Sequence, residues 1–477
     1  MKRHLFLTIT LVMFFLLAVN AFAATRYVAT NGNNRNPGTE SQPWRKLAYA
    51  ADHISSGDTV IVRGGTYSEY FNITTPNVTF QNYPGESPIV DGGHITPVID
   101  QHPTMVMIKA NGVTVDGLTV RNSACYGIYL LRAKNVTIKN VEVYECYRNC
   151  LVIMYSSNNA LIEDCDIHHG AKVYTLWNQR ISRQDPPTVI VKYSDRPIFR
   201  RTKIHDSYNE GLLIDVGTSN AIIEYCEIYG NPKLQLYLCA STNNIIRYNL
   251  IYGTDNGKNV GIYFCHESQR VPEVGNPLVS NSKVYGNLIA NTRKNIAIGG
   301  NTDRQTTNVQ IYNNTLVEAL ECAFLVQPTT GGGHIFKNNI IWQTDGQIAN
   351  IPGGKVECDY NLWSRTPDFD ARGVHDHSYA LPKLTKTSGW KSLRSGELDG
   401  SEFALQSTSP AINAGTPIGA EFDNIPECNR SVWPTKIVLI SQDNQGSGWE
   451  IGADIHVVNS TVLDAPTGLK IESALEQ

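Results

Sequence analysis

Two acidic residues in the middle of the chain stand where a pair of carboxylates could act on a glycosidic bond. Asp215 ends the apolar run Gly211–Ile214, and Glu267 follows the similar run Gly261–Cys265. If these runs are strands two coils apart in a stack, their backbones lie about 10 Å apart. The carboxyl groups could then have the separation of roughly 6.5–9.5 Å that an inverting glycosidase needs. Asp215 and Glu267 are therefore candidate catalytic residues.

Other titratable residues lie close to Asp215 in the sequence. Glu210 and His205 occupy the turn that leads into the Asp215 strand, and Lys192 and Lys233 lie nearby. Glu210 is a further catalytic candidate, and either lysine could act as a base if it were desolvated. The alternative interpretation is that all these side chains are solvated turn residues or members of cross-strand ion pairs.

A stripe of tyrosines would run beside these charges. Strand alternation points Leu213 and Asp215 outward, and a step of 24 residues from Leu213 reaches Tyr237. The next repeat brings Tyr263, and Tyr129 could belong to the same stripe. Tyrosine faces flanked by carboxylates suit a sugar chain, which is apolar on its ring faces and polar at its rim. We therefore expect these tyrosines to bind a polysaccharide.

Two long loops would border this face of the molecule. The first, Gly170–Pro187, carries Trp177 and Arg180, and the second spans His266–Ser280. Long turns beside a strand face are typical of a binding groove. We expect Trp177 and Arg180 to contact the substrate, together with Lys192 and His205.

A repeat of about 24 residues must position these groups. Val136–Val143 aligns with Ala160–Ile167, and Pro197–Ile204 aligns with Ala221–Ile228, each at an offset of 24 residues. The repeats hold short β-branched and aromatic strands broken by Asn and Gly turns. Strands this short are stable when coils stack, because each backbone group pairs with the coil above or below. The sequence thus predicts an all-β solenoid, the parallel β-helix, whereas a β-propeller would need repeats of about 40 residues or more.

Three sets of residues recur at the repeat period and would stack above one another on successive coils. These three columns support the stacking. Four asparagines share one turn position, where side-chain bonding along the stack is favoured, and four charged residues of both signs share the position beside it. The charged column is an expected ion-pair ladder, although its first two members could instead form a calcium site. A third column mixes histidines with tyrosines, which favours surface packing over a metal site. The columns are Asn249, Asn287, Asn314, Asn339; Glu142, Asp166, Lys203, Glu227; and Tyr144, His168, His169, His205, Tyr229, Tyr252.

The N-terminal part carries three further motifs, Arg26–Asn34, Pro43–Ala51 and Gly57–Tyr67. Together they resemble the opening of secreted right-handed parallel β-helix proteins of the pectate-lyase-like superfamily. The resemblance spans roughly residues 25–365 and implies a capping helix within Trp44–Ile54. Leu47, Ala50, Ala51 and Ile54 have the spacing of such a helix. The group includes lyases, glycosidases, epimerases and proteins with no known activity, so the resemblance specifies fold better than chemistry.

Signatures of individual activities in that group are incomplete here. The related calcium-dependent pectate lyases carry an Asp cluster and a Lys on the next strand, whereas this chain has Tyr237 at that strand position and only Asp215 resembling the cluster. Asn301–Asp303 resembles the start of the polygalacturonase signature, but the later motifs are absent. We assign no certain cofactor and leave Ca²⁺ open.

The ends of the chain suggest four segments. Lys2 and Arg3 precede the apolar run Leu5–Val19 and a small-x-small cleavage site, which predicts a signal peptide at 1–23 and a secreted or periplasmic protein. The β-helix domain, including its N-terminal cap, would occupy 24–365. Ser409–Gly415 and Gly448–Ala453 resemble a closing segment, so 366–456 is expected to be an irregular C-terminal cap and 457–477 a linker-like tail.

The composition bears on the partners of the protein, and the cysteine positions bear on its disulfides. The chain has 477 residues, 18% of them charged, and a net charge of −4. This balance argues against a nucleic-acid partner, and no segment after the signal could span a membrane. Export would let cysteines pair, and the alignment predicts Cys239–Cys265 and Cys125–Cys150 disulfides across adjacent coils.

The leading hypothesis is a secreted, monomeric, carbohydrate-active β-helix, a hydrolase or lyase acting on a polysaccharide. The alternative is a non-catalytic protein that binds glycans or serves in surface adhesion. The enzyme needs at least two ionisable groups converging in the groove, whereas the binding protein needs only the aromatic face.

Overall fold

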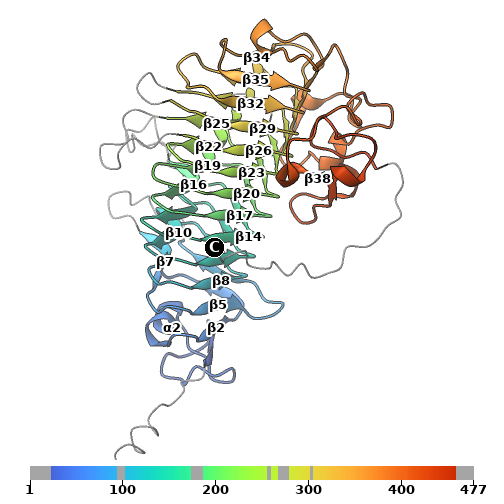
Figure 1. Ribbon diagram of the computed structural model, residues 1–477. Coiled ribbons are helices and arrows are strands. Elements are labelled where there is room, and N and C mark those ends of the chain that lie inside the picture. The colour runs from blue at the N-terminus through green and yellow to red at the C-terminus, as the bar shows by residue number, and fades with distance from the viewer. Residues whose placement is uncertain are drawn as a thin grey trace, which may run out of the picture.

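The chain winds into a right-handed parallel β-helix (Figure 1). The computed structural model describes residues 23–93, 103–172, 186–254, 259–266, 279–300 and 305–457. Three long sheets, which we name A, B and C in the order the chain visits them, hold 13, 13 and 11 strands. Every pairing within them is parallel, for example Leu213 with Tyr237 in sheet C. This confirms the solenoid predicted from the repeat.

The strands of sheet A are β1 (Thr25–Val28), β2 (Thr59–Val62), β5 (Thr79–Asn82), β8 (Thr114–Asp116), β11 (Thr137–Lys139), β14 (Leu161–Glu163), β17 (Ile198–Arg200), β20 (Ile222–Glu224), β23 (Ile245–Arg247), β26 (Lys283–Tyr285), β29 (Gln310–Tyr312), β32 (His334–Lys337) and β35 (Val356–Asp359). Those of sheet B are β3 (Gly65–Tyr67), β6 (Pro88–Asp91), β9 (Thr119–Arg121), β12 (Glu142–Tyr144), β15 (Asp166–His168), β18 (Lys203–His205), β21 (Glu227–Tyr229), β24 (Leu250–Tyr252), β27 (Leu288–Ala290), β30 (Thr315–Val317), β33 (Ile340–Trp342), β36 (Leu362–Trp363) and β37 (His377–Ser378). Sheet C consists of β4 (Phe71–Ile73), β7 (Thr104–Ile108), β10 (Tyr126–Leu131), β13 (Leu151–Met154), β16 (Pro187–Lys192), β19 (Glu210–Ile214), β22 (Leu234–Cys239), β25 (Val260–Cys265), β28 (Lys294–Ile298), β31 (Cys322–Val326) and β34 (Gln347–Asn350).

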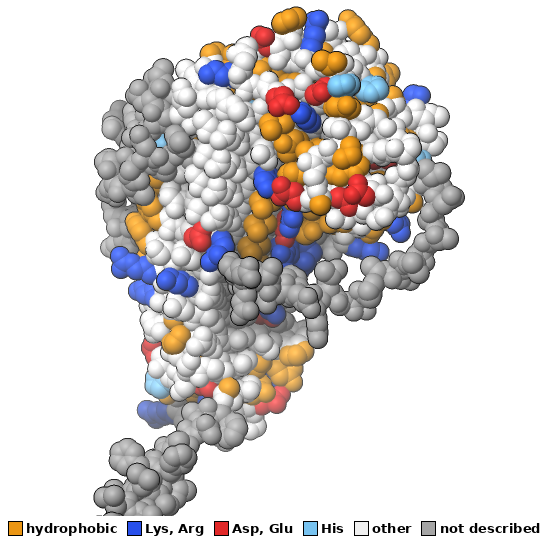
Figure 2. Space-filling model, in the orientation of Figure 1, with side chains coloured by type: hydrophobic (Ala, Val, Ile, Leu, Met, Phe, Trp, Pro, Cys, Tyr) orange, Lys and Arg blue, Asp and Glu red, His pale blue; other side chains and the backbone are white. Residues whose placement is uncertain are grey.

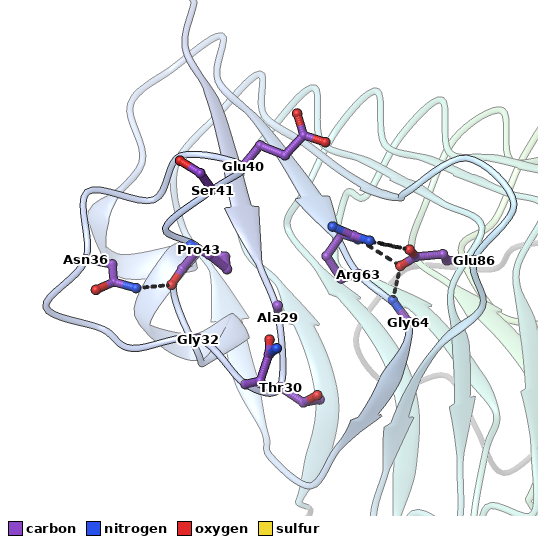
Figure 3. Close-up of a pocket in the computed structure, with 11 residues that line it drawn as sticks. Ala29, Thr30, Gly32, Asn36, Glu40, Ser41, Pro43, Arg63, Gly64 and Glu86 are labelled. Atoms are coloured by element: carbon purple, nitrogen blue, oxygen red, sulfur yellow. Dashed lines mark hydrogen bonds and ion pairs between the residues drawn. The ribbon is translucent and has the colours of Figure 1, made fainter.

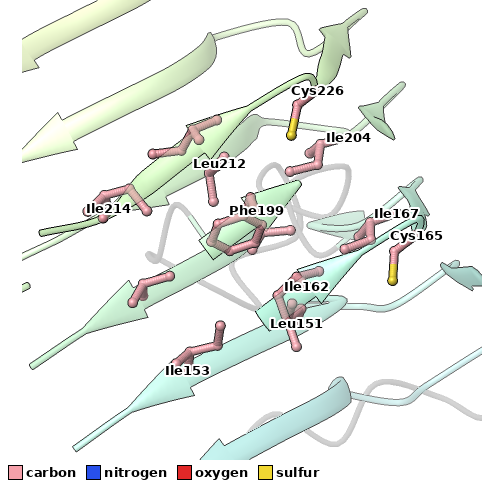
Figure 4. Packing of buried hydrophobic residues seen from close by; sticks show 14 of the residues in the cluster. Leu151, Ile153, Ile162, Cys165, Ile167, Phe199, Ile204, Leu212, Ile214 and Cys226 are labelled. Atoms are coloured by element: carbon pink, nitrogen blue, oxygen red, sulfur yellow. The ribbon is translucent and has the colours of Figure 1, made fainter. Parts of the chain in front are cut away.

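The core fills the space enclosed by the three sheets. Ile162 and Phe199 of sheet A, Ile204 of sheet B, and Leu212 and Ile214 of sheet C all point inward and are fully buried (Figure 4). Each such side chain contributes roughly 1.5–3 kcal/mol by leaving water. Because inward residues repeat once per coil, burial continues along the whole stack.

A short turn of fixed geometry joins sheet A to sheet B. In the later coils one residue adopts a left-handed backbone, as at Tyr248 (φ 58°) and Asn313 (φ 47°), and an asparagine follows it. The Asn249 Nδ2 group donates to Asn287 Oδ1 (2.9 Å), and Asn287 Nδ2 donates to Asn314 Oδ1 (2.9 Å). The predicted asparagine column is therefore a buried hydrogen-bonded ladder, and the left-handed turn residue is the one before it.

Helix α2 (Leu47–His53) covers the N-terminal end of the coil, as predicted. Leu47, Ala50 and Ala51 are buried against the first coil. The Glu69 carboxylate accepts the backbone N–H groups of Leu47 (2.9 Å) and Ala48 (3.0 Å), which satisfies donors that the helix itself leaves unpaired. No helix within the described part of the chain is long and apolar enough to cross a membrane.

The segment after β36 has two roles. Its 3₁₀ turn η2 (Phe369–Ala371) closes the C-terminal end, with Ala371 buried in the main core. The remainder, which includes η3 (Trp390–Ser392), η4 (Gly400–Phe403), η5 (Ala420–Phe422), β38 (Asn424–Pro426), η6 (Cys428–Arg430), β39 (Leu439–Ser441) and η7 (Gln442–Asn444), packs along the side of the later coils (Figure 1). We call residues 381–457 the C-terminal segment.

Sheet B explains where the C-terminal segment docks. Its outward residues are polar in the early coils and become apolar later, as at Leu250, Leu288 and Ile340. These three pack with Trp390 and Phe403 of the C-terminal segment in a second hydrophobic core. Charged side chains gather along the boundary between coil and segment (Figure 2), and there Lys283 pairs with Glu421 at 2.6 Å and Lys391 with Glu318 at 3.1 Å.

Candidate functional site

The outer face of sheet C has the predicted register. Leu213 pairs with Tyr237, Tyr237 with Tyr263, and the two tyrosine rings stack with centroids 5.4 Å apart. Tyr129 lies in the same column, three coils before Leu213, through its pairing with Val152 on β13. The geometry of the stripe is therefore as expected, and its role in binding stays a prediction.

The centre of this stripe is not the open platform that we expected. Tyr237 is 3% exposed and Leu213 is 2% exposed, because they pack with Leu234 and Cys239 in a hydrophobic cluster on the outside of sheet C. Tyr263 borders the cluster and remains half-buried, as does Tyr129. Tyr263 and Tyr129 are therefore the more accessible rings of the stripe, and a contact of Tyr237 with a ligand stays a prediction.

Asp215 lies at the end of strand β19 in an ion pair. Its Oδ2 atom is 2.8 Å from Lys192 Nζ, and its Oδ1 atom accepts the N–H of Val216 at 2.8 Å. The Asp215 carboxylate is fully buried, whereas 21% of the Lys192 side chain is exposed. Lys192 is thus the member of the pair that a ligand can reach, and Asp215 holds it in place. This arrangement corrects the expected role of Asp215 as a carboxylate facing the substrate.

Glu210 forms a second ion pair at the opposite end of the same strand. Glu210 Oε1 is 3.1 Å from Lys233 Nζ, with 7% of the Glu210 side chain and 45% of the Lys233 side chain exposed. Five residues separate Glu210 from Asp215, which in a strand corresponds to about 16 Å. The two carboxylates therefore cannot act on one bond. Glu267, Trp177 and Arg180 lie outside the described residues.

Of the two predicted cysteine pairs, only one is aligned across adjacent strands. Cys239 and Cys265 are direct partners on β22 and β25, which places their Cα atoms within disulfide range. Cys150 instead follows the register of Gly127, since Ile128 pairs with Leu151, and its thiol donates to the His168 carbonyl at 3.4 Å. Cys150 therefore lies out of register with Cys125, and the strand alignment does not favour a Cys125–Cys150 bond. Cys239–Cys265 remains a prediction.

His205 lies on sheet B, away from the stripe. Its ring stacks between His168 (5.0 Å) and Tyr229 (4.7 Å), so the aromatic column is as predicted. Nδ1 lies 2.8 Å from Asp206, and Nε2 lies 2.8 Å from Asp166. Burial lowers the pKa of His205, but the two carboxylates outweigh it and raise that pKa to about 9. His205 is a structural cation there, and its assignment to the sheet C groove is wrong.

The open part of the sheet B face holds a pocket of about 460 Å³ that the sequence had not pointed to. Arg121 and Tyr144 line it, and Arg121 Nη1 donates to the Tyr144 hydroxyl at 3.1 Å. Arg121 also pairs with Asp91 at 2.8 Å, and Lys172 pairs with Glu145. The sequence did contain a signal for this pocket. Arg121 precedes Tyr144 by 23 residues, about one repeat, and so lies in the aromatic column.

The charged ladder beside that column is confirmed by the pairings of Glu142, Asp166, Lys203 and Glu227. Lys203 lies 3.2 Å from Glu227, whereas Asp166 accepts from His205 and Glu142 from Thr119. Within the described part of the chain, no group of three or more His, Cys, Asp or Glu side chains is arranged to hold a metal ion. The ladder contacts therefore favour ion pairing over a calcium site at Glu142 and Asp166.

Two family models and two curated proteins match parts of this chain. A family model described as "Pel9A-like, right handed beta helix region" matches residues 26–178, and one described as "Right handed beta helix region" matches residues 126–303. The uncharacterized protein YwoF of Bacillus subtilis is 30% identical over 130 residues, covering 24% of this chain and 28% of that protein. Pectate lyase PEL9 of Emericella nidulans is 36% identical over 78 residues, covering 15% and 19%. The chain thus spans less than a third of the length of the curated relatives it matches.

Solved structures share the architecture at low sequence identity. Pectate lyase Pel9A aligns with a TM-score of 0.52 and 14% identity over 91% of this chain and 96% of that one. The polygalacturonase of Erwinia carotovora gives 0.52 and 10% over 72% and 98%, and a rhamnogalacturonan lyase gives 0.51 and 15% over 79% and 96%. At these identities the likeness establishes the fold. The chain is a right-handed parallel β-helix protein, and its segments 26–178 and 126–303 match the two β-helix family models.

Proposed function

We propose that this protein acts on a polysaccharide along the outer face of sheet C, as a lyase or a glycoside hydrolase. The observation that carries the proposal is the placement of two ion pairs, Lys192–Asp215 and Glu210–Lys233, at opposite ends of one strand. Both pairs leave part of a lysine side chain exposed on this face, which also carries the half-buried ring of Tyr263. Polar donors on the same face as an aromatic side chain suit a sugar chain.

The similar structures support this class of substrate. Their names describe a pectate lyase, a rhamnogalacturonan lyase and a polygalacturonase, all of which share the β-helix fold with this chain. Fold alone does not specify chemistry, so the assignment depends on the sheet C face itself. Lys192 is the proposed contact with the reacting sugar, and Asp215 is the proposed positioning residue that orients it.

A product assay tests the proposal. The full chain is incubated with polygalacturonan, rhamnogalacturonan, alginate and xylan. Elimination generates an unsaturated sugar that absorbs ultraviolet light, whereas hydrolysis generates reducing ends without that absorbance. Lys192→Met, which removes the ammonium group and keeps most of the side-chain length, should lower activity at least tenfold. Lys139→Met, which removes a lysine paired with Asp116 at 3.1 Å on sheet A, should leave activity unchanged.

A non-catalytic glycan-binding or adhesion protein is the second candidate. The full burial of Asp215 favours it, because the described residues of sheet C then offer no exposed carboxylate pair to a substrate. Affinity electrophoresis with the same polysaccharides separates the candidates. Retained binding without any product would favour the binding protein, and activity unaffected by Lys192→Met would refute the catalytic assignment.

We also propose that residues 1–23 direct export and are removed. The support is the charged start, the apolar run and the cleavage site in the sequence. N-terminal sequencing of the protein recovered outside the cytoplasm should begin at Ala24. Recovery of an intact Met1 from that fraction would contradict the proposal.

A further inference from the structure

A polar cavity of about 600 Å³ lies at the N-terminal end of the coil, remote in sequence from the strands of the proposed site. Figure 3 shows Glu40 and Ser41 along one side of it and Arg63 with Glu86 along another. Thr30 also lines the cavity, on the stretch that follows strand β1. The cavity thus lies between the N-terminal loop and the first coils.

The loop that forms one wall is held in place before any ligand arrives. The Trp44 indole N–H donates to the Asn36 carbonyl at 2.8 Å, and Asn36 Nδ2 donates to the Pro43 carbonyl at 3.0 Å. A Cβ atom at Gly32 would lie 2.2 Å from the Trp44 carbonyl oxygen, so the close approach there requires glycine. A preformed wall reduces the ordering cost that a ligand must offset.

The charged groups of the opposite wall are also fixed. Arg63 donates through Nε and Nη2 to Glu86, whose Oε2 atom additionally accepts the N–H of Gly64 at 2.5 Å. The Arg63 guanidinium lies 4.2 Å from the ring centroid of Tyr83, and the Tyr83 hydroxyl donates to Glu40 at 2.9 Å. About a third of Arg63 and of Glu86 remains exposed, at 35% and 29% of their side chains.

The balance of charge in the cavity indicates the kind of ligand. Two carboxylates, Glu40 and Glu86, face a single guanidinium, so an anionic ligand would meet a net negative wall. Thr30 and Ser41 add hydroxyl groups, which both donate and accept hydrogen bonds, and both residues are exposed. A neutral, hydroxyl-rich ligand matches this mixture of donors and acceptors.

We infer that this cavity binds a neutral sugar unit, at a site separate from the face of sheet C. The Arg63–Glu86 pair also ties β2 to the turn before β6, but that structural role does not require the ring of polar groups around the opening. A second sugar site at the end of the coil would let the protein hold a glycan independently of any reaction on sheet C.

Direct binding measurements test the inference. The full chain is titrated with the neutral probes xylohexaose, cellohexaose and mannohexaose, and with trigalacturonate as an acidic comparison. Calorimetry gives the Kd, and saturation-transfer NMR identifies the bound sugar. Ser41→Tyr and Asn31→Trp, both at exposed lining positions, should weaken binding of a neutral probe at least tenfold. Thr74→Tyr, an exposed position outside the cavity, should not change the Kd.

The outcomes separate this inference from the proposed function. Binding of a neutral probe that is lost in Ser41→Tyr and kept in Lys192→Met supports the cavity site, whether or not any polysaccharide is processed. The inference is overturned if no neutral probe binds, if Ser41→Tyr and Asn31→Trp both leave the Kd unchanged, or if trigalacturonate is the tighter ligand at this site. None of these results bears on product formation at sheet C.

Discussion

Leu213 on β19 and Tyr237 on β22 are direct partners in adjacent parallel strands, although 24 residues separate them in the chain. The same register pairs Tyr237 with Tyr263. Two positions further along these strands, it places Lys192, Asp215, Cys239 and Cys265 side by side on successive coils. Side chains one repeat apart are therefore lateral neighbours about 4.8 Å apart along the stack. The arrangement of both ion pairs on sheet C follows from this spacing.

Removing Asp215 should destabilise the fold strongly. Asp215→Ala leaves the Lys192 ammonium beside a buried gap, and breaking a buried pair in this way costs about 3 kcal/mol. Urea denaturation monitored by circular dichroism gives the change in the free energy of unfolding. Asp116→Ala removes the partner of a more exposed lysine, Lys139, and should cost less than about 1 kcal/mol. Equal changes in the two variants would contradict the buried pair.

The asparagine ladder should be sensitive to one truncation. Asn287→Ala deletes the acceptor for Asn249 Nδ2 and the donor to the Ile246 carbonyl, both of them buried. Leaving such groups unpaired should lower the free energy of unfolding by about 2–4 kcal/mol. Asn350→Ala, at an exposed position on β34, provides the control and should change it by about 0.5 kcal/mol or less. Thermal unfolding of both variants measures the difference.

Stability should fall as the pH rises through the titration of His205. Its folded-state pKa of about 9 exceeds the ordinary value of 6.5, since hydrogen bonds and attraction from Asp166 and Asp206 outweigh its burial. The folded state therefore binds the proton more tightly, so this contribution is complete below pH 6.5 and lost by about pH 9. It is on the order of 3 kcal/mol.

His205→Gln should remove that pH dependence. The groups facing His205 are Asp166 and His168 on β15, Tyr229 on β21 and the adjacent Asp206, so none comes from sheet C. Burial raises the pKa values of Glu450 and Asp454 to about 7, so stability should also fall through that pH in every variant. Between pH 8 and pH 9.5, urea midpoints should fall less in His205→Gln than in the wild type and in His377→Gln, an exposed control on β37. Equal slopes there in His205→Gln and the wild type would assign the effect to other groups.

Oxidation should join Cys239 to Cys265. Their direct pairing on β22 and β25 gives a Cα separation of about 4.8 Å, within the range for disulfides. Non-reducing peptide mapping of protein produced in an oxidising compartment should detect this crosslink and no Cys125–Cys150 crosslink. Alkylation of both Cys239 and Cys265 without prior reduction would contradict the prediction.

Much of the fold could be predicted because residues one repeat apart in the sequence become neighbours on adjacent coils. The 24-residue offset determines which residues become neighbours, so the stripe, the ladders and the aromatic column all followed from aligning Val136–Val143 with its successors. Alternation within strands also assigned Leu213 to the outside correctly. The apolar outward residues Leu250 and Leu288 carried a further signal in the sequence, that of a covered face on sheet B.

The candidate site was harder to predict, for a physical reason. Strand alternation tells which side of a sheet a residue faces, but not what packs over it, so the burial of Tyr237 and Asp215 could not be anticipated. A charged residue beside an outward lysine can equally be a catalyst or an ion-pair partner, and only the 2.8 Å contact distinguishes them. His205 was placed in the correct column but assigned to the wrong face, because sequence spacing does not show how three sheets are oriented.

Photo-crosslinking most directly tests whether polysaccharide is bound along sheet C. A diazirine-labelled oligosaccharide, made from whichever polysaccharide the protein binds or processes, is irradiated with the full chain, and adducts are mapped by mass spectrometry. The account predicts adducts on the peptides containing Lys192, Lys233 and Tyr263, and their loss when unlabelled polysaccharide is in excess. Competed adducts confined to peptides of sheet A or sheet B would contradict it.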